Sequence, residues 1–179
     1  MSKITLTKLE DYDLEQFIKD NQLAFKYGAL EEFGKRDDPF EEEGEIISRD
    51  TIINCVKEGV AYRIREDERI VGGLVLNIND DTKHNHLDLL FVNPNVHSKE
   101  IGYKAWKLVE ELYPDTIVWE TCTPYFETRN IHFYVNKCGF HIVEFFNSHH
   151  PDPNDPETGM EETYDNDYDG MFRFEKYMK

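Results

Sequence analysis

Apolar residues recur along this chain at two different spacings, and the change between them occurs near Val60. Within residues 14–23, apolar side chains stand three or four positions apart, which is the spacing of an amphipathic helix. Within residues 61–78, apolar and polar residues alternate in two runs, AYRIR and RIVGGLVLNI, which are separated by a turn at Glu66, Asp67 and Glu68. This alternation predicts an antiparallel hairpin after the first helices.

The same reasoning predicts the remaining strands and one of their ends. The expected strands cover residues 4–9, 61–65, 69–78, 84–93, 116–121, 141–146 and 171–178. Pro94 follows the fourth of these strands directly. Because proline cannot donate a hydrogen bond to a sheet ladder, pairing should fail there, and the strand should end or splay from its neighbour.

Helices are expected between these strands, and polar residues or glycines mark their ends. Asp13 and Ser48 are candidate N-caps for the first two helices, and Gly59 and Gly139 are candidate terminators. The third helix carries apolar residues at helical spacing from Ile101 and should stop at Pro114. Residues 31–45 lose this periodicity among charges, glycines and a proline, and predict a loop or a broken helix.

Antiparallel strands in the first half and alternating helices and strands in the second predict the fold class. The expected α/β fold is a mixed sheet of six to seven strands with helices on both faces. We expect one domain over residues 1–179, because a chain of this length can bury a sufficient core by itself.

Composition narrows the location and the partners. The formal net charge of -17 disfavours nucleic acid and anionic membranes as partners. Neither a signal peptide nor an apolar run of roughly 20 residues is present, so a cytoplasmic location is expected. Cys55, Cys122 and Cys138 fit no disulfide or zinc-ribbon spacing and are interpreted as reduced, mostly buried thiols. Acidic clusters near residues 41–45 and 152–169 are either solvated loops or a rim that collects a cationic substrate.

Two segments carry a family resemblance. FVNPNVHSKEIG, which ends at Gly102, resembles the pyrophosphate-binding signature of the GNAT superfamily of N-acetyltransferases. RNIHFYVNKCGF, which begins at Arg129, resembles a second motif of the same superfamily. The resemblance implies a GNAT-type fold with splayed central strands and acetyl-CoA as cosubstrate. It also implies backbone donors on the strand before Pro94 that polarise the acetyl carbonyl.

The first motif has a physical basis, because unpaired N–H groups and the positive dipole at a helix start favour a pyrophosphate. His97, Ser98 and Glu100 depart from the signature, and of its glycines only Gly102 is kept. Binding should survive Glu100 if that residue has an ordinary helical φ and points to solvent, and should suffer if it needs a positive φ. The expected cofactor-binding residues are Leu90, Phe91, Val92, His97, Ser98, Lys99, Glu100, Ile101, Gly102, Tyr103, Asn130 and Tyr134.

The resemblance also implies catalytic roles. Tyr134 matches the residue that protonates the leaving CoA thiolate, although its helical position fits core packing as well. Asn130 matches a residue that contacts the pantetheine arm, and could instead be an N-cap. His86, Asp88 and Glu120 are candidate bases that should point into one cleft. The alternatives are an ordered water as the base and a purely structural His86.

No metal site is expected, although two pairs of histidines are noteworthy. His84 lies near His86, and His149 is followed by His150 near Asp152. Zinc needs three or four ligands with supporting groups, and paired histidines on an acidic loop are usually only polar surface.

The predicted function is therefore transfer of an acetyl group from acetyl-CoA to a primary amine of a cationic acceptor, by direct attack of the amine. A second possibility is an enzyme that transfers another acyl group, which would differ from an acetyltransferase in the volume of its acyl pocket. The alternative class is a non-catalytic ligand-binding or interaction module whose cofactor loop has degenerated. A homodimer is a further expectation, with contacts from apolar residues of the last strands: Phe145, Phe146, Phe172 and Phe174.

Overall fold

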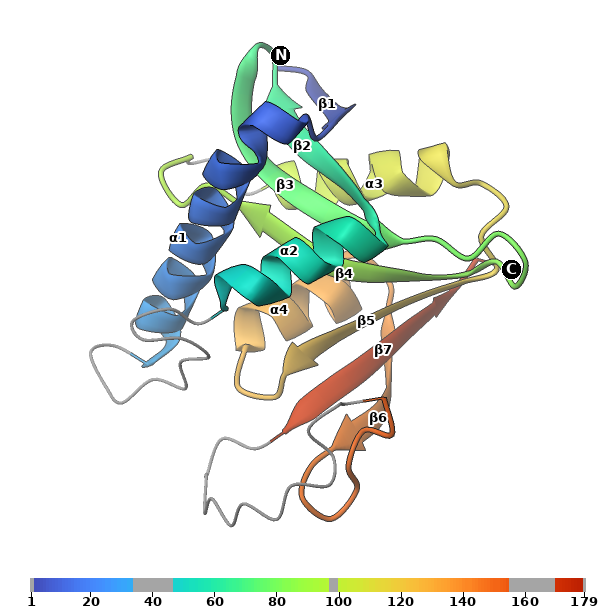
Figure 1. Cartoon of the computed structure of the whole chain (residues 1–179). Coiled ribbons are helices and arrows are strands. Elements are labelled where there is room, and N and C mark those ends of the chain that lie inside the picture. The colour runs from blue at the N-terminus through green and yellow to red at the C-terminus, as the bar shows by residue number, and fades with distance from the viewer. Residues whose placement is uncertain (1, 34–46, 97–99, 155–169, 179) are drawn as a thin grey trace.

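The computed structural model describes residues 2–33, 47–96, 100–154 and 170–178, and within them the strands form one mixed sheet (Figure 1). The order across this seven-stranded sheet is β1-β2-β3-β4-β5-β7-β6. Only β4 and β5 pair in parallel, and the other five pairs are antiparallel. The strands are β1 Ile4–Lys8, β2 Val60–Glu66, β3 Arg69–Asn77, β4 His84–Val92, β5 Val118–Pro124, β6 His141–Phe146 and β7 Met171–Tyr177. This arrangement confirms the mixed sheet that the sequence predicts.

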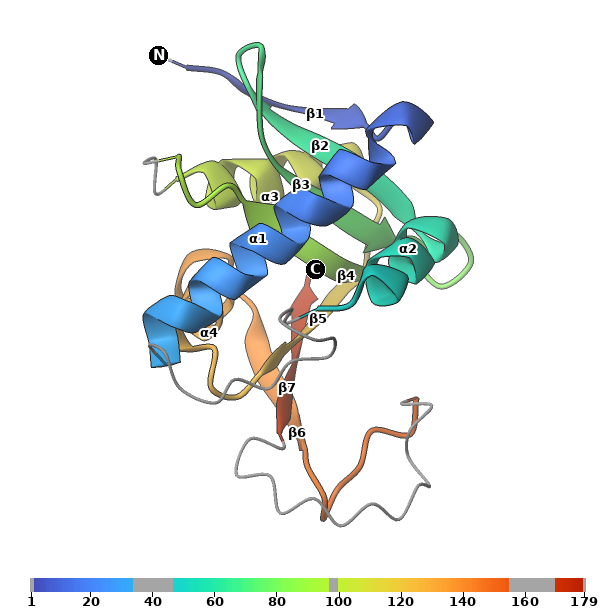
Figure 2. The ribbon, with the colours of Figure 1, turned by 60° about the vertical axis from the view of Figure 1, so that its left-hand side comes forward.

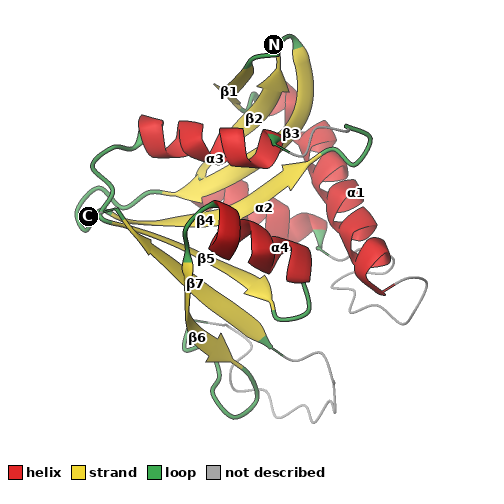
Figure 3. Cartoon of the chain, turned by 180° about the vertical axis from the view of Figure 1, so that it is seen from behind, coloured by secondary structure: helices red, strands yellow, loops and turns green. Residues whose placement is uncertain are grey.

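Helices cover both faces of the sheet (Figures 1 and 3). Helices α1 (Leu14–Phe33) and α2 (Arg49–Glu58) lie over β3 and β4 on one face, which we call the front face, and they pack beside each other (Figure 2). Helix α3 (Ile101–Leu112) and the short α4 (Thr128–His132) lie on the other face, the back face. Helix α4 continues directly into a π-helical turn, η2 (Phe133–Lys137).

Each face has its own apolar core. On the front face, Phe17 and Ile18 of α1 and Ile52 of α2 pack against Leu89 and Phe91 of β4. The back core is larger and includes Leu87, Trp106, Trp119, Tyr134 and Phe174. Leu87 and Leu89 therefore point to opposite faces of β4, although residues two positions apart share a face in a regular strand; the register shift of β4 against β3 at Asp88 reverses the alternation between them.

Local sequence signals explain several element boundaries. The Ser48 hydroxyl accepts a hydrogen bond from the N–H of Thr51, which confirms the predicted N-cap of α2. Gly59 ends this helix with an extended φ of -118°, and an added Cβ would lie only 2.3 Å from the carbonyl oxygen of Leu76. Close approach of β3, and not a left-handed φ, therefore requires glycine there. Gly139 follows η2 with a φ of +83°, the left-handed conformation expected of a glycine terminator.

Some expectations require correction. Asp13 was expected to cap α1 with its side chain. It lies instead in the 3₁₀ turn η1 (Asp11–Asp13), and its carboxylate accepts hydrogen bonds from Arg63 of β2. Helix α1 continues to Phe33, so the first three residues of the stretch expected as a loop or a broken helix, 31–45, are helical, and residues 34–45 lie outside the described residues. Of the three thiols, only that of Cys138 is buried, while Cys55 and Cys122 are half-buried.

The C-terminal strands place their aromatic residues unevenly. Phe146 and Phe174 are buried within the chain, Phe172 is half-buried and Phe145 is 41% exposed. Only the last two therefore have surface to offer a partner subunit, which reduces the support for the expected homodimer contact. Among the described residues, no helix is both long enough and apolar enough to cross a membrane.

Candidate active site

The two parallel strands in the middle of the sheet separate from each other. Strands β4 and β5 pair only at His84 with Val118, Asn85 with Trp119 and His86 with Glu120. Beyond this point β4 stays paired with β3 as far as Val92, while β5 stays paired with β7 as far as Pro124. Strand β4 thus ends just before Pro94, as predicted, whereas its separation from β5 begins earlier, directly after His86. We call the opening between β4 and β5 the splay.

A β-bulge in β4 lies where the splay begins. The pairing of β3 with β4 shifts register between Val75 and Leu76, and Asp88 is left without a partner residue on β3. The amide of Asn93 donates to the carbonyl of Val71, toward β3. Because amide directions alternate along a strand, the N–H groups of Leu90 and Val92 point the other way, toward the splay. Bulges commonly lie beside active sites, where they redirect backbone and side chains.

Tyr134 lies at the back face of the splay. Its ring packs against Phe140 and Phe174, and the residue is only 8% exposed, which agrees with the core-packing interpretation of its position. Burial raises the pKa of the phenol far above its usual value, although a hydrogen bond with the Thr121 side chain opposes this effect. The phenol is therefore protonated over the working range of pH and keeps a proton that it can donate.

Thr121 connects this phenol to the strand across the splay. Its hydroxyl donates to the carbonyl oxygen of Leu87 over 2.9 Å, just after the last paired residues of β4 and β5. The contact satisfies a carbonyl that has lost its sheet partner. Thr121 thereby places the hydroxyl of Tyr134 next to the point where the strands part.

The candidate bases lie at the front face of the splay. Nδ1 of His86 is 2.7 Å from Oδ1 of Asp88, close enough for an ion pair although the angle does not suit a hydrogen bond. Burial by itself lowers the pKa of His86, but contacts with Asp88 and Cys122 outweigh it and raise the pKa to about 10. His86 is therefore mainly protonated at neutral pH. It must lose this proton before it can accept one from an amine.

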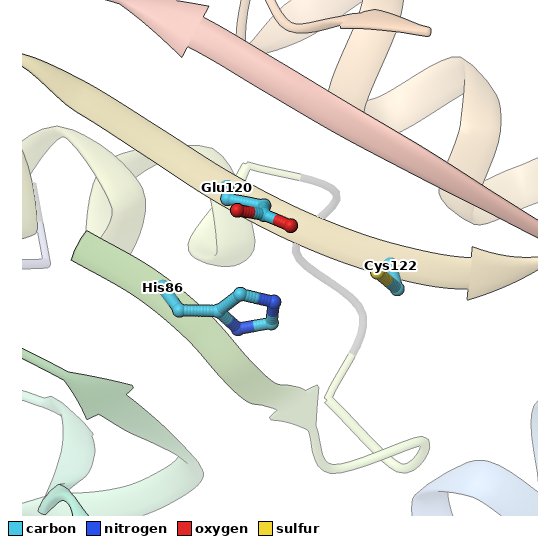
Figure 4. Close-up of side chains that lie close together, drawn as sticks. All are labelled: His86, Glu120 and Cys122. Atoms are coloured by element: carbon cyan, nitrogen blue, oxygen red, sulfur yellow. The ribbon is translucent and has the colours of Figure 1, made fainter. Parts of the chain in front are cut away.

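Glu120 lies directly across from His86 (Figure 4). Its carboxylate contacts Nε2 of His84 at 2.9 Å and Nη1 of Arg173 at 3.6 Å. Donor atoms of His86, Glu120 and Cys122 all lie within 4.8 Å of one another. The structure thus brings the three predicted bases together and adds Cys122, which follows Glu120 by two positions on β5.

The start of α3 is the expected pyrophosphate site. His97, Ser98 and Lys99 lie outside the described residues. Glu100 is the N-cap residue of α3, with a φ of -105°, and its exposed carboxylate pairs with Lys104 at 3.3 Å. No left-handed conformation is needed there, so the glutamate leaves the backbone N–H groups of Ile101, Gly102 and Tyr103 in helical geometry. A Cβ at Gly102 would come within 3.4 Å of the Phe133 ring, at the edge of ordinary van der Waals contact.

Asn130 does not cap its helix. It is the third residue of α4, which starts at Thr128, and Glu127 occupies the cap position. Its side-chain amide donates to the Thr123 hydroxyl of β5 at 3.4 Å. The N-cap interpretation is therefore wrong, and a role beside the cofactor stays a prediction.

Two residues of this region, Thr121 and Cys122, are not among the site residues that the sequence predicts. Thr121 ends the strand expected at residues 116–121, Cys122 lies just beyond that strand, and neither residue belongs to a motif. The one available signal was the alternation itself, because continuing it past Glu120 by two positions would place Cys122 on the same face as Glu120. A separate hollow of about 250 Å³ between α2 and the start of β2 contains none of the predicted site residues.

Comparison with known proteins supports the resemblance. The sequence model of the acetyltransferase (GNAT) family matches residues 23–140. The chain is 47% identical over 181 residues to the uncharacterized protein YrkN of Bacillus subtilis, and the alignment covers 99% of this chain and 95% of YrkN.

Solved structures of acetyltransferases share the fold. An IAA acetyltransferase from Bacillus cereus superposes with a TM-score of 0.64 at 18% identity, over 98% of this chain and 99% of that one. A spermidine N-acetyltransferase from Vibrio cholerae, in complex with CoA and spermine, superposes with a TM-score of 0.64 at 14% identity, over 98% and 95% of the two chains. The predicted GNAT-type fold is thereby confirmed.

Proposed function

Because the chain belongs to the GNAT family of acetyltransferases, we propose that it transfers an acetyl group from acetyl-CoA to a primary amine of a cationic acceptor. The splay between β4 and β5 carries this proposal. It is flanked by a buried phenol at the back face and by titratable side chains at the front face. Acyl transfer requires an acid for the leaving thiolate and a base for the attacking amine, on opposite sides of the carbonyl.

The backbone of β4 provides the electrostatic part of the mechanism. The N–H groups of Leu90 and Val92 face the splay, where the thioester carbonyl would lie. Fixed donors of this kind stabilise the oxyanion that forms when the amine attacks. The cofactor's pyrophosphate would accept hydrogen bonds from the first N–H groups of α3, and its pantetheine arm would pass between Val92 and Asn130.

Proton transfer is assigned to the two faces. Tyr134 donates its proton to the CoA sulfur as the carbon–sulfur bond breaks. At the front face, Glu120 receives the ammonium proton directly or through water, and His86 beside Asp88 receives it only after it has lost its own proton. Since the pKa of a primary ammonium is about 10.4, a partner of similar pKa accepts this proton with little energetic penalty.

The acidic surroundings favour a cationic acceptor. Glu120, Glu144 and Glu175 lie around Arg173 on neighbouring strands, and three carboxylates exceed the one guanidinium in charge. Such a surplus attracts ammonium groups and disfavours anionic acceptors. The spermine bound to the Vibrio cholerae enzyme supports polyamines as the first acceptors to try.

Two measurements test this function. Titration with acetyl-CoA should show saturable binding, and ligand at 100 times Kd should stabilise the fold by about 2.7 kcal/mol. Incubation of the acetyl-CoA complex with spermidine, spermine or a basic peptide should then yield one CoA per acetylated amine, as measured by mass spectrometry. Binding without transfer to any amine would favour the ligand-binding module, and a failure to bind up to millimolar concentration would exclude the proposed cofactor.

Replacement of Glu100 tests the start of α3. Glu100→Gln removes a negative charge from the cap of this helix and frees Lys104 from its ion pair. We expect Kd for acetyl-CoA to fall about threefold at low salt, and the gain to vanish at high ionic strength because salt screens exposed charges. Calorimetry at two salt concentrations measures both effects.

Glu111→Gln is the matched control. Glu111 is exposed at the other end of the same helix, eleven positions after Glu100 and roughly 16 Å from it. It should leave Kd unchanged. Weaker binding by Glu100→Gln would show instead that the glutamate supports the loop.

A further inference from the structure

His86, Glu120 and Cys122 form a cluster of potential metal ligands at the front face of the splay. One donor atom from each lies within 4.8 Å of the other two, and all three residues are half-buried (Figure 4). The cluster combines an imidazole, a carboxylate and a thiol, which come from two adjacent strands. Sequence reasoning considered only pairs of histidines and therefore found no metal site.

The supporting contacts resemble those of real metal sites. Asp88 lies 2.7 Å from Nδ1 of His86, which leaves Nε2 as the ring nitrogen available to an ion. A carboxylate beside the second nitrogen of a metal-binding histidine fixes the ring and increases its basicity. Glu120 is held by His84 and Arg173, yet each carboxylate oxygen keeps a further lone pair for an ion.

The donor set selects the kind of ion. Calcium and magnesium prefer oxygen ligands alone, whereas a thiolate with an imidazole favours Zn²⁺. Three protein ligands with one open position is the arrangement of zinc sites that bind water or substrate. The strands provide such an opening here, because β4 and β5 separate beyond His86.

We infer that the splay is a Zn²⁺ site, with His86, Glu120 and Cys122 as ligands and Asp88 orienting His86. Bound Zn²⁺ inhibits acetyl transfer, because it occupies the imidazole and the carboxylate that would accept the proton of the amine. The inhibition rests on the proposed function, whereas the binding does not.

The first experiment measures binding to the full chain without acetyl-CoA. Metal-free protein is titrated with Zn²⁺ in a calorimeter and with Co²⁺ in a spectrophotometer, where a thiolate ligand gives a charge-transfer band. We expect one ion per chain with a Kd of about 1 μM or tighter, and displacement of Co²⁺ by Zn²⁺. The absence of Zn²⁺ binding in this range would overturn the proposal.

Matched variants locate the ion. Cys122→Ser should abolish the charge-transfer band and raise the Kd for Zn²⁺ about 100-fold, and Asp88→Asn should raise it about tenfold. Cys55→Ser removes a half-buried thiol on α2, outside the cluster, and should change neither quantity. If Cys55→Ser or neither variant weakened binding, the ion would lie elsewhere and the proposed site would be wrong.

Activity separates this inference from the proposed function. Zn²⁺ should inhibit acetyl transfer by the unaltered chain, and about 100-fold more Zn²⁺ should be needed for Cys122→Ser, each compared with its own metal-free rate. Binding at the cluster in a chain that acetylates no amine would refute the proposed function and leave the zinc site standing. Transfer that is insensitive to bound Zn²⁺ would refute the inhibition.

Discussion

Tyr134→Phe should lower kcat about 100-fold, because general acid catalysis contributes at least this factor and phenylalanine has no proton to give. The Kd for acetyl-CoA should stay nearly unchanged, since the hydroxyl acts on the sulfur as it leaves and not on the bound ground state. The phenyl ring retains the contacts with Phe140 and Phe174. Single-turnover kinetics with saturating acetyl-CoA, together with calorimetry, measures the two quantities separately.

Tyr113→Phe is the control for this experiment. Tyr113 hydrogen bonds Tyr62 through the two hydroxyls at 2.8 Å, and it lies just after α3 and outside the splay. Loss of this hydroxyl should reduce stability by about 1 kcal/mol and leave kcat unchanged. Equal kcat values for Tyr134→Phe and the unaltered chain would show that Tyr134 serves only the core.

Local signals were sufficient to predict most of the fold from the sequence. Alternation identified the strands, because alternate residues of a strand share one face and pack in one core, as Leu89 and Phe91 of β4 do. Ser48 and Pro94 mark boundaries through the backbone groups of their immediate neighbours in the chain. Asp13 was misinterpreted as an N-cap because the partner of its carboxylate, Arg63, is fifty positions away in the chain and cannot be found from local sequence.

The candidate site was predicted less completely, because its geometry depends on register. The bulge at Asp88 and the three-residue pairing of β4 with β5 decide which side chains meet in the splay. Neither feature has a sequence signature. The contact of Thr121 with Leu87 and the position of Cys122 beside His86 follow from that register alone. Glu100 could be recognised as unusual, but only its backbone angle decided whether the helix start tolerates it.

Arg63 is the strongest example of a residue whose role the sequence conceals. It occupies a strand position that alternates with apolar residues, yet it is 2% exposed. Its guanidinium donates to Asp13 through two nitrogens at 2.7 and 3.0 Å and to Asp20 at 3.0 Å, and it lies over the ring of Phe17. These bonds join β2 to the start of α1, which in turn covers Leu89 and Phe91 of β4.

Arg63→Met should therefore lower the free energy of unfolding by about 3 kcal/mol. Methionine fills the space beside Phe17 but leaves Asp13 and Asp20 close together without their cation. Asp13 and Asp20 keep some contact with water, so the loss falls at the low end for broken buried pairs. Urea unfolding followed by circular dichroism measures this loss. An unchanged slope of the unfolding free energy against urea concentration would show that Arg63→Met and the unaltered chain unfold in the same way.

Arg69→Met provides the comparison that isolates burial. Arg69 pairs with Glu66 at 3.1 Å, but 76% of its side chain is exposed. Both substitutions remove one positive charge from a chain of net charge -17, so any change in overall repulsion is similar for the two. Because exposed ion pairs contribute little, Arg69→Met should cost less than about 0.5 kcal/mol. Near-equal costs for the two variants would mean that net charge, and not the buried contacts with Asp13 and Asp20, governs the effect, and that α1 is held on the sheet by its apolar face alone.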